Sequence, residues 1–558
     1  MAPDQSKDEQ RMTAEDKDKV TRRGYVKYAG AGIIVVAGAA AGAYYASRPA
    51  SPGVTTTETS ATSAGPKYGG VINNGMGTKS FSLDPALAGN EGEYGVIFTA
   101  YERLLRYDEN MTLQPELSER WEASPDGTEY TFYIRKGVKF HNGKELTADD
   151  VRYTFDRLNE MKEQSVAGLF FAKLDHTELI DDYTVKIVNS EPWAPFLNAM
   201  PLHSASILPR LPIEEEVDFN TAVIGTGPFQ MTDRVQGQYE KFDKFADYWV
   251  QGIPYADTLW FRRVVDDTAR AMSFESKQFD SQEGFSSKDA QRLMTSPDLT
   301  FVQKQSQTWS CLEFQVNAQS RIFAPDPAKG EKINSDRPRK LRLAMNYAMN
   351  REEIARVVYE EFAKATYTGF PPEYLGYYSP PGFGQDINKA KQLLTEAGYP
   401  DGLKGVKLCT YPDFHFPEQA ELLQTQVAQA GIQMDIEVQE VNTFVQTMGE
   451  GAADITLDCN VLKLDPALSI APYPAWVLNY QTGMDPAFDQ IEHDCYTIMD
   501  PAQRAEALKK LQSYLFFENA WFIAIVYWDY LAAWWNNVHG VKVSNPTLCL
   551  KFEDTWKE

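Results

Sequence analysis

The sequence predicts a mixed α/β protein built from more than one lobe. Its 558 residues exceed the roughly 250–300 residues at which a single hydrophobic core stops growing, so we expect two to four domains. Residues 406–457 follow the order β-α-β-α-β, which favours a mostly parallel sheet. Residues 97–161 show a hairpin pattern followed by a capped helix, which we assign to a second lobe.

The clearest local patterns lie between residues 336 and 460. Asn350 followed by Glu353 resembles a capping box that begins a helix. Gly398 and Gly431 stand where helices end, and Pro417 suits a first helical turn. Apolar spacing predicts helices at about 341–348, 350–358, 387–397, 417–430 and 443–450, and strands at 406–411, 432–438 and 454–457.

The segment 97–161 has two distinct signals. The turn Ser124-Pro125-Asp126-Gly127 separates strand patterns at 120–121 and 130–134, as in a β-hairpin. Thr147 then suits the N-cap of a helix that continues through Leu158. We expect these residues to form scaffold.

The composition is that of a globular protein, with 43% hydrophobic and 24% charged residues. Its formal net charge of -24 repels nucleic acid, so that class of partner is excluded. The five cysteines form no CxxC pair, and their odd number leaves at least one unpaired within the chain. We expect most of them to be small buried residues: Cys311, Cys409, Cys459, Cys495 and Cys549.

The N-terminal segment, residues 1–49, predicts export from the cytoplasm. Arg22 and Arg23 precede a weakly apolar stretch at 28–46, which resembles a twin-arginine export signal. Positive residues stay on the cytoplasmic side, so the rest of the chain should lie outside. Two outcomes are compatible with the pattern, cleavage near 43–46 or retention as a membrane anchor. No cysteine follows the stretch, so lipoprotein anchoring is not supported.

Residues 50–66 read ASPGVTTTETSATSAGP. This Ser/Thr-rich segment has almost no apolar content, so we expect a flexible tether. The folded part should then work close to the outer face of the cytoplasmic membrane, or in the periplasm after cleavage of the signal.

The segment 101–157 resembles the signature region of the family 5 extracellular solute-binding proteins, which bind peptides, nickel chelates and related solutes. Further landmarks follow in the order found in that family, over about residues 69–558. The matches include Tyr101, Glu102, Leu104, Trp121, Asp126, Gly127, Phe132, Arg135, Gly137, Phe140, Thr147, Asp150 and Arg157, then Leu83–Ala86, Gly225–Phe229, Tyr248–Trp249, Asn317, Leu341–Arg351 and Asp465–Pro466.

The resemblance implies a two-lobe α/β fold of the periplasmic-binding-protein type, with a hinge and an interlobe cleft. Lobe I would comprise residues 67–309 and 529–558, and lobe II residues 310–528. A solute would bind in the cleft, the lobes would close over it, and a monomeric protein would deliver it to the permease of an ABC importer. The resemblance implies no cofactor and no resident metal.

The stretch 458–466, which includes Asn460, is the first candidate for solute contacts. In peptide-binding members of the family an acidic residue just before an Asp-Pro-like loop pairs with the peptide amino group, and here Leu462 falls at that place. Lys463 would instead suit an anionic group on the solute. The alternatives are that Lys463 points to solvent and that Asp465 anchors its own turn.

Three further residues are candidates from their positions in the chain. Trp309 precedes the expected crossover strand and would form either a wall of the cleft or part of the core. Met76 and Tyr94 are candidates from the first lobe.

Other classes of function lack support in the sequence. Gly75–Ser80 (GMGTKS) lacks the ending and spacing of a phosphate-binding loop. Glu492, His493, Asp494 and Cys495 are adjacent, so on a helix they cannot all face one metal ion. No catalytic motif is present, so we expect a binding protein and not an enzyme. Transport and solute sensing by a tethered receptor remain alternatives, as do peptide, sugar, opine-like acid and nickel chelate as the solute.

Overall fold

The computed structural model describes residues 65–558, apart from 78–81, 90, 110, 163–164, 166–167, 169, 213–216, 361, 381–382, 462–464, 471–477, 479 and 545–547. The predicted export segment, including Arg22 and Arg23, lies outside the described residues, as do most of the tether and Lys463. Within the described part of the chain, no helix is both long and apolar enough to cross a membrane.

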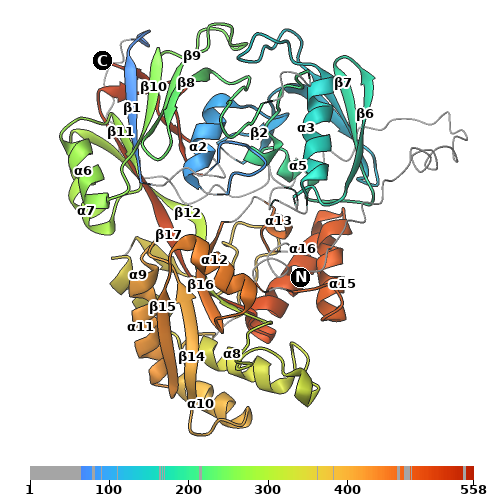
Figure 1. Cartoon of the computed structure of the whole chain (residues 1–558), viewed down its shortest axis with the longest axis vertical. Coiled ribbons are helices and arrows are strands. Elements are labelled where there is room, and N and C mark those ends of the chain that lie inside the picture. The colour runs from blue at the N-terminus through green and yellow to red at the C-terminus, as the bar shows by residue number, and fades with distance from the viewer. Residues whose placement is uncertain are drawn as a thin grey trace, which may run out of the picture.

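The chain forms an upper and a lower lobe, joined by two long strands (Figure 1). One sheet of eleven strands runs through both lobes in the order β15-β14-β16-β12-β17-β11-β1-β10-β9-β8, with β13 added beside β17. The two joining strands are β12 (Leu299–Phe314) and β17 (Phe522–Trp535). They pair antiparallel from Leu299 opposite Trp535 to Glu313 opposite Phe522.

The upper lobe contains the other end of this sheet and a separate sheet of four antiparallel strands in the order β4-β5-β7-β6. Its main strands are β1 (Val71–Met76), β4 (Ser118–Ala123), β5 (Glu129–Ile134), β6 (Leu174–Asp181), β7 (Thr184–Asn189), β8 (Phe229–Val235), β9 (Tyr239–Lys244), β10 (Thr258–Arg263) and β11 (Ser281–Glu283). Its helices include α2 (Glu91–Ala100), α3 (Ala148–Glu160), α5 (Phe196–Ala199), α6 (Asp267–Glu275) and α7 (Ser287–Leu293).

The lower lobe places helices around the strands β13 to β16. Its strands are β13 (Ala363–Ala365), β14 (Leu403–Thr410), β15 (Ile432–Val438) and β16 (Ile455–Val461). Its helices are α8 (Asp336–Ala348), α9 (Arg351–Val358), α10 (Ile387–Glu396), α11 (Phe416–Ala428), α12 (Val441–Glu450), α13 (Pro466–Ile470), α15 (Pro486–Thr497) and α16 (Pro501–Gln512).

The structure confirms the mixed α/β prediction and most of the elements expected from the sequence. β14 is parallel to both β15 and β16, as the β-α-β-α-β pattern requires. The hairpin is β4–β5, and Gly127 in its turn has φ 71°. Thr147 caps α3 together with Asp150.

The capping box expected at Asn350 is only half formed. The Asn350 side chain accepts a hydrogen bond from the Glu353 backbone N–H at 3.0 Å. Glu353 does not return the bond in the expected way, because its carboxylate accepts from Gln426 Nε2 at 2.9 Å. The Asn350 backbone N–H donates to Gln426 Oε1 instead, at 3.0 Å. A residue of α11 has thus replaced the local partner, which a single sequence pattern could not indicate.

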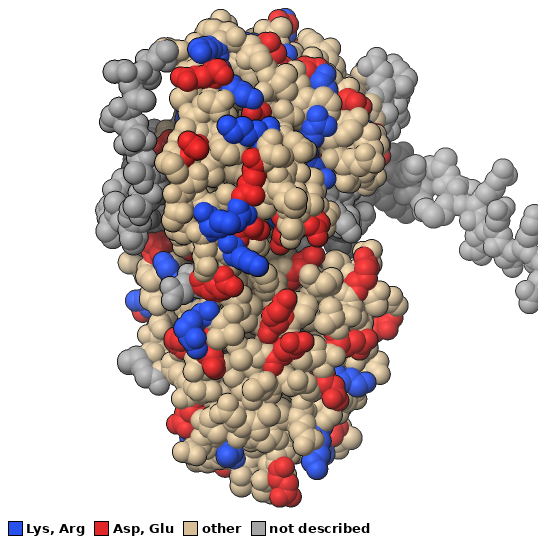
Figure 2. Space-filling model, turned by 90° about the vertical axis from the view of Figure 1, so that its left-hand side faces the viewer, with Lys and Arg blue, Asp and Glu red and all other residues tan. Residues whose placement is uncertain are grey.

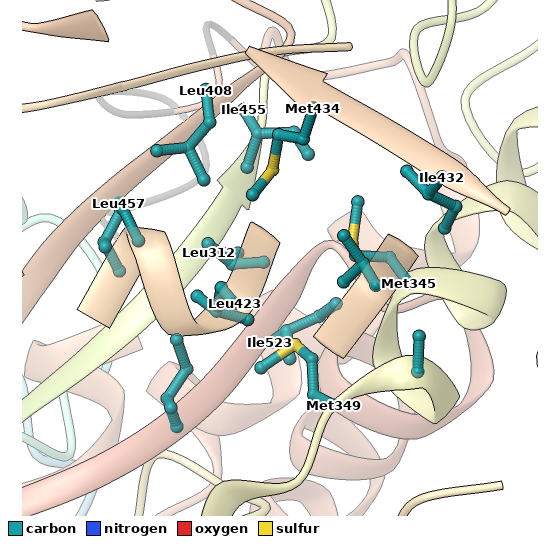
Figure 3. Close-up of a cluster of buried hydrophobic side chains, with 14 of the residues drawn as sticks. Leu312, Met345, Met349, Leu408, Leu423, Ile432, Met434, Ile455, Leu457 and Ile523 are labelled. Atoms are coloured by element: carbon teal, nitrogen blue, oxygen red, sulfur yellow. The ribbon is translucent and has the colours of Figure 1, made fainter. Parts of the chain in front are cut away.

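The core of the lower lobe lies between the sheet and helices α8 and α11. Apolar residues of β12, β14, β15, β16 and β17 alternate so that one set faces these helices, and none of the side chains named below is more than 4% exposed. Figure 3 shows this packing for Leu312, Met345, Met349, Leu408, Leu423, Ile432, Met434, Ile455, Leu457 and Ile523.

Charged groups are also buried, in pairs. Glu240 on β9 accepts from Arg263 Nε on β10 at 3.0 Å, and both side chains are fully buried. Arg263 also donates to the Gly92 carbonyl at 3.2 Å. By contrast, the Lys139–Asp247 pair at 2.8 Å has both side chains about half exposed, 46% and 56%.

These two pairs predict different responses to substitution. Glu240→Ala should lower the free energy of unfolding by about 3–5 kcal/mol, because it leaves a buried guanidinium without its counter-charge. Asp247→Ala is the control and should change it by at most about 0.5 kcal/mol. Urea unfolding followed by circular dichroism measures both. Equal effects would contradict this account of the buried pair.

Candidate functional site

Three side chains that end in polar groups lie in a row across the joining strands β12 and β17 and the adjacent strand β16. Trp309 on β12 is directly opposite Tyr527 on β17 and directly opposite Asn460 on β16. Opposed residues of antiparallel strands project from the same face, so the three side chains are neighbours. The register of β12 against β17 shifts on both sides of Trp309, between Gln305 and Trp309 and again before Cys311.

Each member of this row has one buried polar atom that makes no hydrogen bond within the described part of the chain. The three atoms are Trp309 Nε1, Asn460 Oδ1 and the Tyr527 hydroxyl, and the residues are 2%, 3% and 3% exposed. A buried polar group without a partner costs free energy, commonly about 1–3 kcal/mol, and such groups are rare in native proteins. An indole N–H donor and an amide oxygen acceptor are therefore both available to a bound molecule.

The Trp309 ring is held on two sides. Its indole lies against Phe516 with ring centroids 5.7 Å apart. On another side is Gly369, where an added Cβ would be 2.7 Å from Cζ2 and 3.1 Å from Cε2 of the indole. Glycine is therefore needed at position 369 for this ring position, and the direction of the Nε1–H is fixed by packing.

The amide nitrogen of Asn460 is engaged by a chain of buried groups on the same face. Asn460 Nδ2 donates to Cys311 Sγ at 3.2 Å, and Cys311 Sγ lies 3.6 Å from Glu313 Oε1, to which it donates. The Thr456 hydroxyl donates to Glu313 Oε2 at 3.0 Å. Sequence analysis did not single out Cys311, Glu313 or Tyr527. The period-two spacing of Trp309, Cys311 and Glu313 was visible, but their register against β16 was not.

Burial disfavours the charged forms of the acidic groups in this chain. Burial, and then the nearby Asp458 carboxyl, raise the pKa of Glu313 well above its ordinary value. Burial likewise raises the pKa of Asp458, although Tyr411 donates a hydrogen bond to it at 2.7 Å. Burial raises the pKa of the Cys311 thiol as well. All five cysteines are free thiols, and four of them are buried, as expected.

Five residues beyond Asn460, the chain forms a contact between the lobes. Asp465 is fully buried and accepts from both terminal nitrogens of Arg504 on α16, at 2.6 and 2.7 Å. Asp465 Oδ2 also accepts from Asn198 Nδ2, on α5 of the upper lobe, at 2.9 Å. Asp465 Oδ1 accepts from the backbone N–H of Ala467 at 3.0 Å, so this carboxylate both anchors its own turn and contacts the other lobe.

The same contact is extended by aromatic stacking. Trp193 of the upper lobe stacks on Tyr496 of α15, with ring centroids 4.2 Å apart. The Ala194 N–H donates to the Tyr496 carbonyl at 2.7 Å. Leu468 of α13 packs into the core of the four-stranded sheet, and Figure 1 shows α13 at the junction of the lobes.

Met76 and Tyr94, the candidates from the upper lobe, lie in its packing. Met76 ends β1 and is 4% exposed. Tyr94 on α2 is 3% exposed and stacks on His203 at 4.2 Å. The structure brings Trp309 and Asn460 together, whereas Met76 belongs to a hydrophobic cluster of the upper lobe and Tyr94 stacks on His203. A surface depression beside Arg135, Lys139 and Trp249 involves none of the residues predicted to contact solute.

The row offers hydrogen-bonding groups to a bound molecule. Within the described residues, no group of three or more His, Cys, Asp and Glu side chains is placed to hold a metal ion. Glu492–Cys495 lie on α15. Charges on one face are mixed, with Lys and Arg gathered mostly on the upper lobe (Figure 2).

Two lobes of α/β structure joined by paired strands define the class of two-lobe binding proteins. The model of the bacterial extracellular solute-binding proteins, family 5 (middle region), matches residues 112–469. This is more than half of the chain, which therefore belongs to that family.

Individual relatives agree with this assignment. The chain is 26% identical over 497 residues to the glutathione-binding protein GsiB of Salmonella choleraesuis strain SC-B67, covering 86% of this chain and 93% of GsiB. It is similar to the periplasmic binding protein DppA of Helicobacter pylori, solved with the peptide STSA, at 25% identity and a TM-score of 0.75, over 88% and 99% of the two chains. The fold of MoaA from A. tumefaciens R10, solved with mannopinic acid, matches at a TM-score of 0.76 and 23% identity, over 88% and 100%.

The buried carboxyl of Glu313 predicts a specific pH dependence of stability. Because its pKa is raised in the folded state, its contribution is fully present below the unfolded pKa and is lost as pH rises through the folded pKa. Glu313→Gln keeps the shape of the side chain but removes the carboxyl group that titrates. The difference in melting temperature, variant minus wild type, should therefore increase from pH 5 to pH 9.

The exposed Glu421 offers the control, since Glu421→Gln should give a difference that stays flat over the same range. Melting curves at five pH values decide the matter. A Glu313→Gln difference that falls with pH would mean that Glu313 is ionised in the folded protein.

Proposed function

We propose that this protein is the extracytoplasmic substrate-binding component of an ABC importer. It captures a peptide or peptide-like solute between its lobes and delivers it to a membrane permease, without acting on the solute chemically. Membership of the family supports this proposal. So does the description of DppA as ABC transporter-associated, and so do the names of relatives that bind glutathione or a peptide.

The observation that carries the proposal is the pair of unpartnered buried atoms, Trp309 Nε1 and Asn460 Oδ1. Trp309 lies on β12, which joins the lobes, and Asn460 lies opposite it on the adjacent strand β16, five residues before the interlobe contact of Asp465. A solute that bonds to them would remove the cost of their burial, and that gain is available only where the lobes enclose it.

We place the hinge where β12 and β17 pass between lobes, with 67–309 and 529–558 in lobe I and 310–528 in lobe II. Trp309, the last residue of the first segment of lobe I, would line the cleft together with Asn460 and Lys463 of lobe II, with Lys463 suited to an anionic group. Asp465 would act on the cleft indirectly, by holding its own turn in place. Met76 and Tyr94 would support the wall of lobe I. Residues 1–49 and 50–66 would export the protein and tether it near the membrane.

The proposal is tested by finding the solute. The full-length chain, purified in mild detergent, should carry small molecules that native mass spectrometry can identify. Peptides, glutathione, sugars, opine-like acids and nickel chelates should then be compared by thermal shift. A solute present at 100 times its dissociation constant should stabilise the protein by about 2.7 kcal/mol, because it binds only the native state.

Substitution of Lys463 refines this test. Lys463→Ala should weaken binding of the identified solute at least tenfold, about 1.4 kcal/mol, if an anionic group of the solute contacts it. Lys509 on α16, whose side chain is 43% exposed, offers a control, Lys509→Ala, with unchanged affinity. Failure of every solute to stabilise the wild-type protein would contradict the proposed function.

A further inference from the structure

Trp309 on β12 and Asn460 on β16 indicate a chemical class of solute more narrowly than the fold does. Resting on the proposed function, we propose that Trp309 and Asn460 together bind an uncharged amide of the solute, and that Cys311 and Glu313 are positioning residues that fix the Asn460 side chain. The site would then select a carboxamide, a lactam or an acylated amine over a free ammonium group.

The two unpartnered atoms differ in what they require. The indole N–H can only donate, and the Asn460 oxygen can only accept. Directly opposed residues of an antiparallel pair have Cβ atoms about 4.5–5.5 Å apart, so one group of the solute can reach both. That group must offer an acceptor and a donor side by side. A primary carboxamide, a lactam or one residue of an extended peptide does so, whereas a carboxylate offers only acceptors and an ammonium group only donors.

The orientation of the Asn460 amide follows from the buried groups behind it. Its nitrogen donates to Cys311 Sγ at 3.2 Å, and the thiol donates in turn to Glu313, 3.6 Å away. Glu313 is held by the Thr456 hydroxyl at 3.0 Å, which itself accepts from Gln315 Nε2 at 3.2 Å. A flipped amide would lose the bond to sulfur and would turn a second donor toward the Trp309 N–H. The chain of groups therefore keeps an acceptor beside a donor.

The charge around the row favours an uncharged solute group. Burial raises the pKa of both Glu313 and Asp458, the carboxyls nearest to Asn460 on these strands. A raised pKa disfavours the ionised form of these carboxyls, which an ammonium group would need as its counter-charge, and a buried ammonium without one is costly. An amide carries no such cost. The hydrogen-bonding pattern and the local charge thus favour the same class of solute.

The experiment compares matched pairs of probes that differ in one amine. The full-length chain in mild detergent is titrated calorimetrically with dialanine and N-acetyl-dialanine, and with glutamate and pyroglutamate. The acetylated or lactam member of each pair should bind at least tenfold more tightly. Asn460→Leu should reduce this preference to less than threefold, because it removes the oxygen that accepts from the amide N–H. Trp309→Phe, which keeps a ring but removes the N–H, should weaken the amide members about tenfold.

The positioning role of Cys311 is tested by the preference for the amide member of each probe pair, and not by the stability of the variant. Cys311→Ala should reduce the preference for the amide member to less than threefold, because Asn460 loses the acceptor that fixes it. Cys311→Ser is the matched control and should retain the preference, since a hydroxyl can accept from Asn460 and donate to Glu313. Circular dichroism and melting temperature establish that each variant is folded.

Each of the following results would contradict a specific part of the proposal. Tighter binding of the ammonium members, equal affinities, or no binding of either pair by the wild-type protein would overturn the amide assignment. The proposed function would still be judged separately, by the co-purified solute. Equal preferences in Cys311→Ala and Cys311→Ser would overturn the positioning role of Cys311.

Discussion

The antiparallel pairing of β12 with β17 is the constraint on which the rest of the structure depends. These strands pair with each other from one lobe into the other, and the remaining strands of the large sheet are added on either side. Any change in the angle between the lobes must bend this ladder. Its register shifts on both sides of Trp309, so irregular pairing occurs at the residue that also bears an unpartnered donor.

A second feature of the candidate site is that it contains buried polar groups whose lack of partners costs free energy in the folded protein. Most buried polar groups here are satisfied by specific partners, as in Arg504 with Asp465 and Arg263 with Glu240. Against that background, the indole N–H of Trp309 and the amide oxygen of Asn460 are exceptions. Neighbouring residues fix the positions of both groups, because Gly369 and Phe516 hold the indole and Cys311 holds the amide. A fixed donor and acceptor bind with less loss of conformational entropy than mobile ones.

Much of the fold could be predicted from the sequence, because the signals were local. Helical spacing, Gly398, Gly431 and the Thr147 cap gave the elements of both lobes. The site was less accessible. Trp309 and Asn460 were named from position, but their opposition depends on pairing between residues 151 positions apart in the chain, which no local pattern encodes. The roles of Cys311 and Glu313 depend on the same register. Asp465 was named for the solute, and its contacts to Arg504 and Asn198 come from distant segments.

The measurement that tests the central claim most directly is the indole N–H resonance of Trp309 during titration with the co-purified solute. Protein labelled with ¹⁵N-tryptophan would be used, with the resonance assigned by its loss in Trp309→Phe. The account predicts a saturable downfield shift of this resonance, because the N–H gains its first acceptor. A solute that binds to saturation and leaves the Trp309 resonance unchanged would contradict the account.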